Sequence, residues 1–174
     1  MSTSAHVFPE RVRSIHAQAR STGIPVQGNR GVKVTADCLI DRSPTELYAF
    51  CRKPENLPRI LDYPAQISPV PGNAAQWSIK VPFDGQQVTW DTAIINDEPG
   101  RLIAWQSLDG APAPNAGTLR FEPVPGSAGT KVTVQVEFDP PGKLAALFSG
   151  IVRSKAKHHV ADALQRLKRA MEMS

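Results

Sequence analysis

Residues 88–107, VTWDTAIINDEPGRLIAWQS, contain two strands and the turn that joins them. β-Branched or aromatic side chains recur at every second position as far as Ile94, and the alternation resumes at Ile103. A period of two residues is typical of a strand with one buried face. Asp97-Glu98-Pro99-Gly100 lies between the two runs and is typical of a turn. The stretch therefore predicts an antiparallel hairpin.

Further strands and two short helices are expected on either side of this hairpin. Ser43-Pro44-Thr45-Glu46 predicts a helix start, because serine caps the first turn, proline suits its first position and glutamate completes a capping box. Pro54 ends that helix, and a second short helix follows near residues 55–61. Alternating runs bounded by turn residues predict the other strands, which fall near residues 31–40, 65–69, 77–81, 117–121 and 132–138.

One long helix is expected at the C-terminal end. Residues 143–172 contain no proline and only Gly150, and apolar residues such as Val160, Leu164 and Leu167 recur at helical spacing. A sheet with one apolar face must bury it, and this helix is the only element large enough to do so. Because a twisted sheet cannot follow a straight helix along its whole length, the two should separate at one end and leave an apolar cavity.

The expected fold is therefore α+β, a curved antiparallel sheet of about six to seven strands wrapped around a long C-terminal helix, with two short helices after the first strand. The chain has 174 residues, of which 41% are apolar, and this suits one domain with a sizeable core. We expect residues 31–174 to form that domain. Residues 1–30 are expected to form a basic N-terminal arm, partly ordered or flexible.

The net charge of +4 is unevenly distributed along the chain. Residues 1–30 have four arginines and one glutamate, residues 143–174 have seven basic and two acidic side chains, and residues 31–142 have nine basic and thirteen acidic ones. A uniformly basic nucleic-acid-binding protein would not show this division, so no nucleic-acid partner is expected. The basic residues of the last helix are expected to form a solvated face, with transient contact with a membrane surface as the alternative.

Several other classes of protein are excluded by missing patterns. No apolar run approaches the ~20 residues that cross a bilayer, and the N-terminus lacks the apolar core of a secretory signal. Cys38 and Cys51 provide neither a disulfide framework nor a zinc pattern, so a cytoplasmic protein is expected. Adjacent His158 and His159 point in different directions on a helix and are not expected to bind a metal. Glycine-rich phosphate loops and the serine-hydrolase and C-x-x-C motifs are absent, so no cofactor is expected.

The order of elements carries several short motifs, namely Glu55-Asn56-Leu57-Pro58-Arg59, Trp90-Asp91, Pro99-Gly100-Arg101-Leu102-Ile103-Ala104-Trp105, Phe121-Glu122-Pro123 and Asp139-Pro140-Pro141-Gly142. With these motifs, residues 31–172 resemble the START-like, helix-grip (SRPBCC, START/Bet v 1-like) superfamily. More narrowly, they resemble its bacterial polyketide cyclase/dehydrase-like group, which is related to coenzyme Q-binding proteins. The resemblance implies an internal site for a lipid, sterol, quinone, hormone or polyketide, and it implies catalysis in only some members.

The candidate site follows from the faces of the predicted strands. Inward-facing aromatic rings would stack on a flat ligand, and inward hydroxyl groups would orient a ligand carbonyl or hydroxyl group. The start of the long helix would border the mouth of the cavity. The ligand-binding residues predicted in this way are Trp77, Ile79, Trp90, Thr92, Ile103, Trp105, Ser107, Leu119, Phe121, Phe148 and Ile151. The alternatives are ordinary core packing for the apolar side chains and hydrogen bonds to nearby backbone for the hydroxyl groups.

The sequence gives little support for catalysis. Asp91, Glu122 and Glu137 are predicted to face outward, and no inward pair of acid and base is found. Arg59 and Asp62 are the nearest polar candidates at the edge of the cavity. Binding or carriage of a hydrophobic small molecule (lipid, quinone or polyketide-like) is therefore the main hypothesis. A polyketide cyclase/aromatase or dehydratase-type enzyme is the alternative, and an interaction module whose basic ends dock on an acidic partner or membrane is the third.

Overall fold

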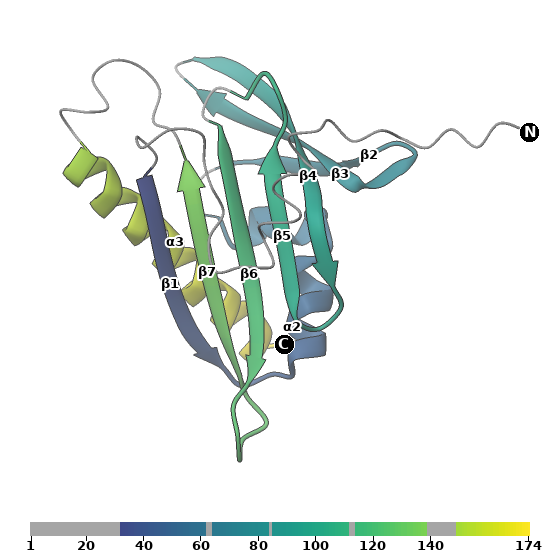
Figure 1. The fold of residues 1–174 in the computed structure, drawn as a ribbon, viewed down its shortest axis with the longest axis vertical. Helices are drawn as coiled ribbons and strands as arrows, with labels where there is room; N and C mark the ends of the chain where they lie inside the picture. The colour runs from purple at the N-terminus through teal and green to yellow at the C-terminus, as the bar shows by residue number, and fades with distance from the viewer. Residues whose placement is uncertain (1–31, 62–63, 84, 112–113, 139–148) are drawn as a thin grey trace, which may run out of the picture.

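The computed structural model describes residues 32–61, 64–83, 85–111, 114–138 and 149–174. The chain runs through one strand, two short helices, six further strands and a long helix, as expected from the sequence (Figure 1). In chain order the elements are β1 (Val32–Ile40), α2 (Pro44–Cys51), the 3-10 helix η1 (Pro54–Arg59), β2 (Gln66–Val70), β3 (Asn73–Phe83), β4 (Gln86–Glu98), β5 (Leu102–Ser107), β6 (Asn115–Pro123), β7 (Thr130–Phe138) and α3 (Ser149–Glu172).

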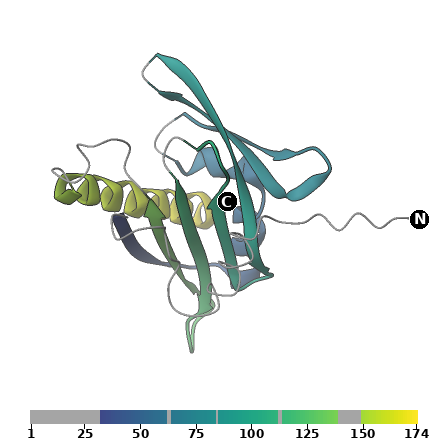
Figure 2. The ribbon, with the colours of Figure 1, turned by 45° about the horizontal axis from the view of Figure 1, so that its top comes forward.

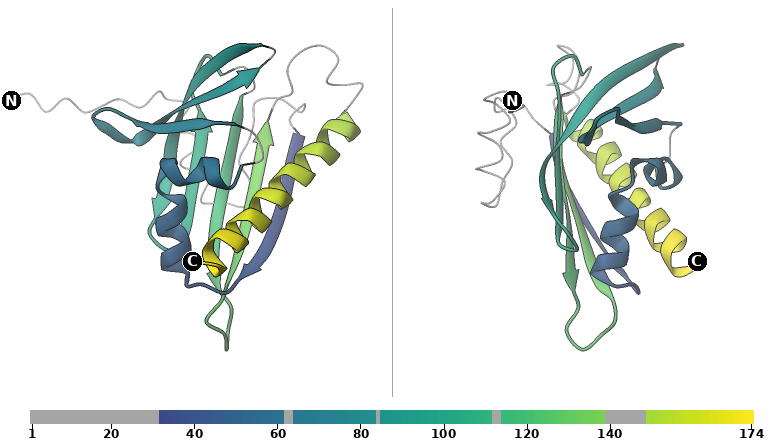
Figure 3. Two further views of the ribbon diagram at one scale, coloured as in Figure 1. Left: turned by 180° about the vertical axis from the view of Figure 1, so that it is seen from behind. Right: turned by 90° about the vertical axis from the view of Figure 1, so that its right-hand side faces the viewer.

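The strands form one antiparallel sheet in the order β1-β7-β6-β5-β4-β3-β2. The sheet is strongly curved, and β3 and β4 bend toward the side of the helices (Figure 2). All described helices lie on this concave side, α3 across one part of the sheet and α2 with η1 across another (Figure 3). The helix-grip architecture is therefore confirmed.

The first helix forms where the sequence predicts it, because its first turn is capped from both directions. The Ser43 hydroxyl group accepts a hydrogen bond from the Glu46 backbone amide at 3.2 Å, and the Glu46 carboxylate accepts one from the Ser43 amide at 3.0 Å. The Ser43 hydroxyl group also donates to the Glu46 carboxylate at 2.8 Å, and this bond, followed by the one from the Ser43 amide, lowers the pKa of Glu46. The next element begins at Pro54 and is a 3-10 helix with a second proline, Pro58, inside it.

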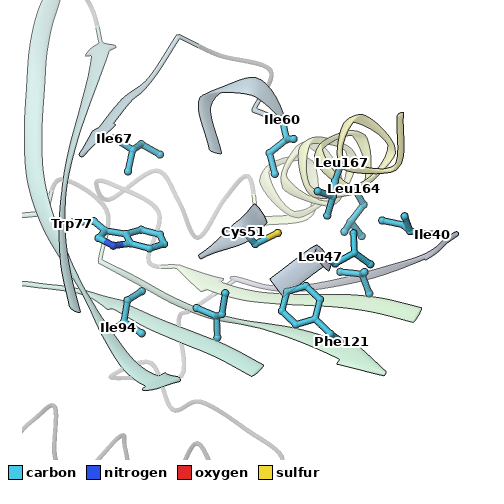
Figure 4. Close-up of a cluster of buried hydrophobic side chains, with 12 residues drawn as sticks. Ile40, Leu47, Cys51, Ile60, Ile67, Trp77, Ile94, Phe121, Leu164 and Leu167 are labelled. Atoms are coloured by element: carbon cyan, nitrogen blue, oxygen red, sulfur yellow. The ribbon is translucent and has the colours of Figure 1, made fainter. Parts of the chain in front are cut away.

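The core fills the space between the concave face and the helices (Figure 4). Leu164 and Leu167 of α3 and Leu47 of α2 are each no more than 3% exposed, and they pack in one cluster with Ile40 and Phe121 of the sheet. Burying a side chain of this size contributes roughly 1.5–3 kcal/mol to stability. The C-terminal half of α3 is therefore the part that holds the helix against the sheet.

The hairpin of β4 and β5 differs from simple alternation because β4 contains a bulge. Ile94 pairs with Trp105 before the bulge and Asn96 pairs with Ala104 after it, so Ile95 is an extra residue. The bulge shifts the inward phase from even to odd residue numbers, so Asp97 shares a face with its partner Ile103. The turn also comes later than the sequence predicts, since β4 continues to Glu98.

We predict that Leu167→Ala lowers the free energy of unfolding by about 2–5 kcal/mol, because it removes most of a side chain that is 1% exposed and leaves a cavity. Urea unfolding followed by circular dichroism measures the change. The control is Met173→Ala just beyond the same helix, where the side chain is 83% exposed and the expected change is within about 0.5 kcal/mol. Equal effects of the two substitutions would contradict this account of the core.

Candidate functional site

Most of the predicted ligand-binding residues share the concave face, as the strand register shows. Trp77 pairs with Thr92, Thr92 with Ser107, and Ile79 with Trp90. The register continues through the pairs Ile103 with Leu119, Trp105 with Gly117, and Phe121 with Val132. Directly paired residues of an antiparallel sheet point to the same face. Phe148 lies outside the described residues, and for Ile151 only the backbone position in α3 is described.

The exposure of these residues changes along the strands. Ile103 and Phe121 are each 2% exposed and belong to the packed core, and Trp77 is 6% exposed beside them. One or two positions further along the same face, the apolar side chains are partly exposed, namely Ile79, Trp90, Trp105, Leu119, Val134 and Val136. The concave face is therefore closed where α2 and the C-terminal half of α3 pack. We call the partly exposed apolar positions its open end.

A glycine sets the position of one tryptophan in the open end. Gly117 lies directly opposite Trp105, and a Cβ atom built on Gly117 would lie 2.2 Å from Cζ2 of the Trp105 indole. The ring therefore lies against the backbone of β6, in space that any other residue at position 117 would occupy. In this position the indole covers the sheet and leaves one of its faces toward the concave side.

Two buried side-chain atoms of the concave face have no hydrogen-bond partner, one on Trp90 in the open end and one on Thr92 beside the packed core. Among the described residues, the buried side-chain atoms without a hydrogen bond on this face are Nε1 of Trp90 and Oγ1 of Thr92. Thr92 is 2% exposed, and the two residues are separated by one position on β4, so they point to the same face about 7 Å apart. A buried polar group without a partner costs about 1–3 kcal/mol, which an oxygen atom of a ligand would recover.

Ser107 differs from Thr92 although the two are directly paired. The Ser107 hydroxyl group accepts a hydrogen bond from the Asn115 backbone amide at 2.9 Å. It therefore follows the alternative given by the sequence, a hydroxyl group that satisfies nearby backbone. Of the two predicted polar residues, Thr92 is the one whose hydroxyl oxygen makes no hydrogen bond.

Sequence reasoning missed a polar cluster beside the core. The Tyr48 hydroxyl group donates to Oδ1 of Asp97 at 2.5 Å, and Nε of Arg52 donates to Oδ2 at 2.8 Å. The Arg52 guanidinium also lies 5.6 Å from the centre of the Trp77 ring. Simple strand alternation predicts Asp97 in a turn, because it does not include the bulge in β4. The run Ala93-Ile94-Ile95, which interrupts the alternation, was the available sign of that bulge.

The remaining polar candidates are not brought together. Asp91, Glu122 and Glu137 pair with Ser78, Lys131 and Lys33 on the convex face, as predicted. Arg59 lies 5.5 Å from the centre of the Phe50 ring, and Asp62 is outside the described residues. His158 and His159 are both exposed. In the described part of the chain, no group of three His, Cys, Asp or Glu side chains is arranged to hold a metal ion.

A family model described as "Polyketide cyclase / dehydrase and lipid transport" matches residues 31–172, the whole of the grip architecture just described. The chain belongs to this family. Membership confirms the resemblance of the short motifs to the polyketide cyclase/dehydrase-like group. The description covers both enzymes and lipid transport, so it admits a hydrophobic-ligand carrier and a cyclase alike.

Solved structures with the same fold agree with the family assignment. A protein from Deinococcus radiodurans is 28% identical, with a TM-score of 0.65, over 81% of this chain and 97% of its own. A Thermus thermophilus protein is 20% identical, with a TM-score of 0.63, over 82% of this chain and 99% of its own. The di-domain ARO/CYC protein BexL of the BE-7585A biosynthetic pathway is 22% identical, with a TM-score of 0.58, over 80% of this chain and 46% of its own. A comparison with curated proteins gave no match.

Within the described residues, none of the helices of this family member combines the length and the apolar character that a membrane span needs.

We predict that Gly117→Ala displaces the Trp105 indole, because the new methyl group would occupy the place of the ring. The expected cost is about 1–3 kcal/mol in the free energy of unfolding, together with a shifted tryptophan fluorescence maximum. The control is a double-mutant cycle with Trp105→Leu, in which Gly117→Ala should cost much less. An additive cycle would show that Gly117 and the ring do not depend on each other.

We predict that Tyr48→Phe flattens the loss of stability at alkaline pH. Burial of the ring, and then its hydrogen bond to Asp97, raise the pKa of Tyr48 to about 12, against about 10 in an unfolded chain. The folded state therefore keeps the proton longer, and this contribution is complete below about pH 10 and lost as the pH rises through about 12. Urea unfolding of both proteins from pH 8 to 11.5 measures the difference between their free energies of unfolding. The titration of the lysines cancels in this difference, because both proteins contain them. Parallel curves would contradict the raised pKa.

Proposed function

We propose that the protein binds or carries a flat, hydrophobic small molecule with at least one oxygen atom, held at the open end of the concave face. The observation that carries this proposal is the pair of unpartnered polar atoms, Trp90 Nε1 and Thr92 Oγ1, among partly exposed apolar side chains. An indole N–H donates only, and a threonine hydroxyl group donates or accepts, so a carbonyl or hydroxyl oxygen fits both. Quinones and polyketide-like rings have this chemistry.

Burial of apolar surface would supply most of the affinity. At ~25 cal/mol per Å², removing about 200 Å² of ligand surface from water contributes roughly 5 kcal/mol. The face of the Trp105 indole that points away from Gly117 is suited to stacking on a flat ring. Each hydrogen bond to Trp90 or Thr92 would add about 0.5–1.5 kcal/mol and would fix the orientation of the ligand.

A cyclase/aromatase or dehydratase-type enzyme is the second candidate, and Asp97 is the observation that favours it. Asp97 lies on the concave face near Tyr48, and BexL, which shares the fold, is described as a di-domain ARO/CYC protein. A general base must be free to accept a proton, however, and both oxygens of Asp97 already accept hydrogen bonds, one from Tyr48 and one from Arg52. The raised pKa of Tyr48 also keeps its hydroxyl group protonated near neutral pH, so it is not available as a base. Binding is therefore the function that the geometry supports better.

We predict that 9-fluorenone binds about 2–10-fold more tightly than fluorene, which has the same flat rings without the carbonyl group. Thr92→Val should abolish the preference, because valine keeps the shape of threonine and removes the hydroxyl group. Trp90→Phe should reduce it. Equilibrium dialysis of the two compounds measures both affinities, and Thr133→Val on the convex strand face is the matched control, expected to leave the preference unchanged.

Native mass spectrometry of freshly purified protein provides an independent test. A reproducible oxygen-containing lipophilic adduct, reduced in Thr92→Val, is the expected result. No adduct, together with equal binding of fluorenone and fluorene, would overturn the proposal. Turnover of an aromatic polyketide-like substrate that is lost in Asp97→Asn would instead establish the enzyme.

A further inference from the structure

A second apolar cluster lies on the opposite, convex face of the sheet. It consists of Ala93, Ile95, Ala104 and Ala116, which are 2%, 4%, 0% and 4% exposed, and we call it the convex patch. Figure 3 shows that α2, η1 and α3 all lie on the concave side, so none of them covers these residues. Small side chains on an uncovered sheet remain accessible to solvent from above. Their burial therefore indicates a covering segment on this face.

The covering segment must be longer than the neighbouring loop. Leu108, just after β5, packs against the convex patch, but Ala104 lies four positions earlier on the same strand, about 13 Å away. Thr118, which pairs with Ala104, is also only 5% exposed. One leucine side chain cannot extend over that distance. A helix of eight to ten residues, at 1.5 Å per residue, is about 12–15 Å long and matches it.

We propose that the N-terminal arm, residues 1–30, docks on the convex patch through its stretch around residues 12–19. The strand register places the arm beside the patch, because Val32 pairs with Phe138 and Phe138 pairs with Asn115, next to Ala116. Val32 and Asn115 are therefore two strand spacings apart, which is about 10 Å. The twelve residues between Ala19 and Val32 can extend to roughly 40 Å, so the chain is long enough to reach every part of the patch.

The chemistry of the two surfaces is complementary. Val12, Ile15 and Ala19 form an apolar stripe at helical spacing, and the alanines of the convex patch would allow a helix to approach closely. Gln106, which pairs with both Ala93 and Ala116, has a buried Oε1 without a hydrogen-bond partner. An arginine or amide donor of the arm would satisfy it.

Charge favours the same arrangement. The arm has a net charge of +3 and residues 31–142 have a net charge of −4, and the attraction is intramolecular. The other undescribed segment of some length, residues 139–148, joins β7 to α3, which lies on the concave side. The arm is therefore the better candidate for the occupant of the convex patch. The family match begins at residue 31, so the family model does not include the arm.

Thiol accessibility in the full-length chain tests the proposal. Ala104→Cys places a reporter in the convex patch, and Cys38→Ser removes the partly exposed native thiol. The reporter should react slowly with a maleimide in this background. Adding Val12→Asp and Ile15→Asp should accelerate the reaction at least tenfold, because the apolar stripe can no longer dock. The matched control, Ser14→Asp with Gln18→Asp, adds the same charges beside the stripe and should leave the rate low.

Two further measurements make the result decisive. Glu122→Cys, at an exposed position of β6, should react equally fast in every background. Hydrogen exchange in the unaltered sequence, compared with Val12→Asp and Ile15→Asp alone, gives the same test without a reporter and should show faster exchange confined to β4–β6. An unchanged, slow rate in the stripe variant would overturn the proposal. A rate that rises on dilution of the protein would also overturn it, since it would show that a second copy covers the convex patch.

Discussion

A straight helix and a curved sheet can pack closely along only part of their length, and this constraint shapes both ends of the molecule. Here the contact is made by Leu164 and Leu167 in the C-terminal half of α3, together with Leu47 of α2. The sheet beneath them is closed and forms the core. Further along the same strands, the inward side chains contact the edge of this core but stay partly exposed. The candidate site is thus the part of the apolar face that the helix leaves uncovered.

The chemistry of that region depends on small local differences within a uniform sheet. Gly117 gives Trp105 a place against the backbone, where a side chain would have raised the ring away from the sheet. Thr92 and Ser107 are paired and have the same type of group, yet only Ser107 meets a backbone amide. The result is an apolar surface with unused hydrogen-bonding groups concentrated on one strand, β4. Such a surface favours a ligand that is mostly apolar and has few polar atoms.

The sequence was sufficient for the architecture because strand alternation, the capping box and the long proline-free helix are all local patterns. Strand phase also placed Trp90 and Thr92 on the concave face, since both lie before the bulge in β4, and it placed Trp77 of β3 on the same face. Asp97 was missed because it lies after that bulge. Which hydroxyl group would be satisfied could not be predicted either, because the partner of Ser107 is an amide of the neighbouring strand. Such contacts depend on register, which the sequence specifies only through the whole sheet.

The bulge in β4 links the two faces of the sheet. One extra residue directs Ile95 and Asn96 to the convex side and returns Asp97 to the concave side. Without it, Asn96 would face the concave side, and Asp97 would not reach Tyr48 and Arg52 beside the core. A sheet that buries apolar side chains on both faces needs cover on both, and α3 can cover only one. The family model covers the domain without the arm, and the proposed docking of the arm, which has the length, the charge and the apolar stripe, would complete the cover on the convex side.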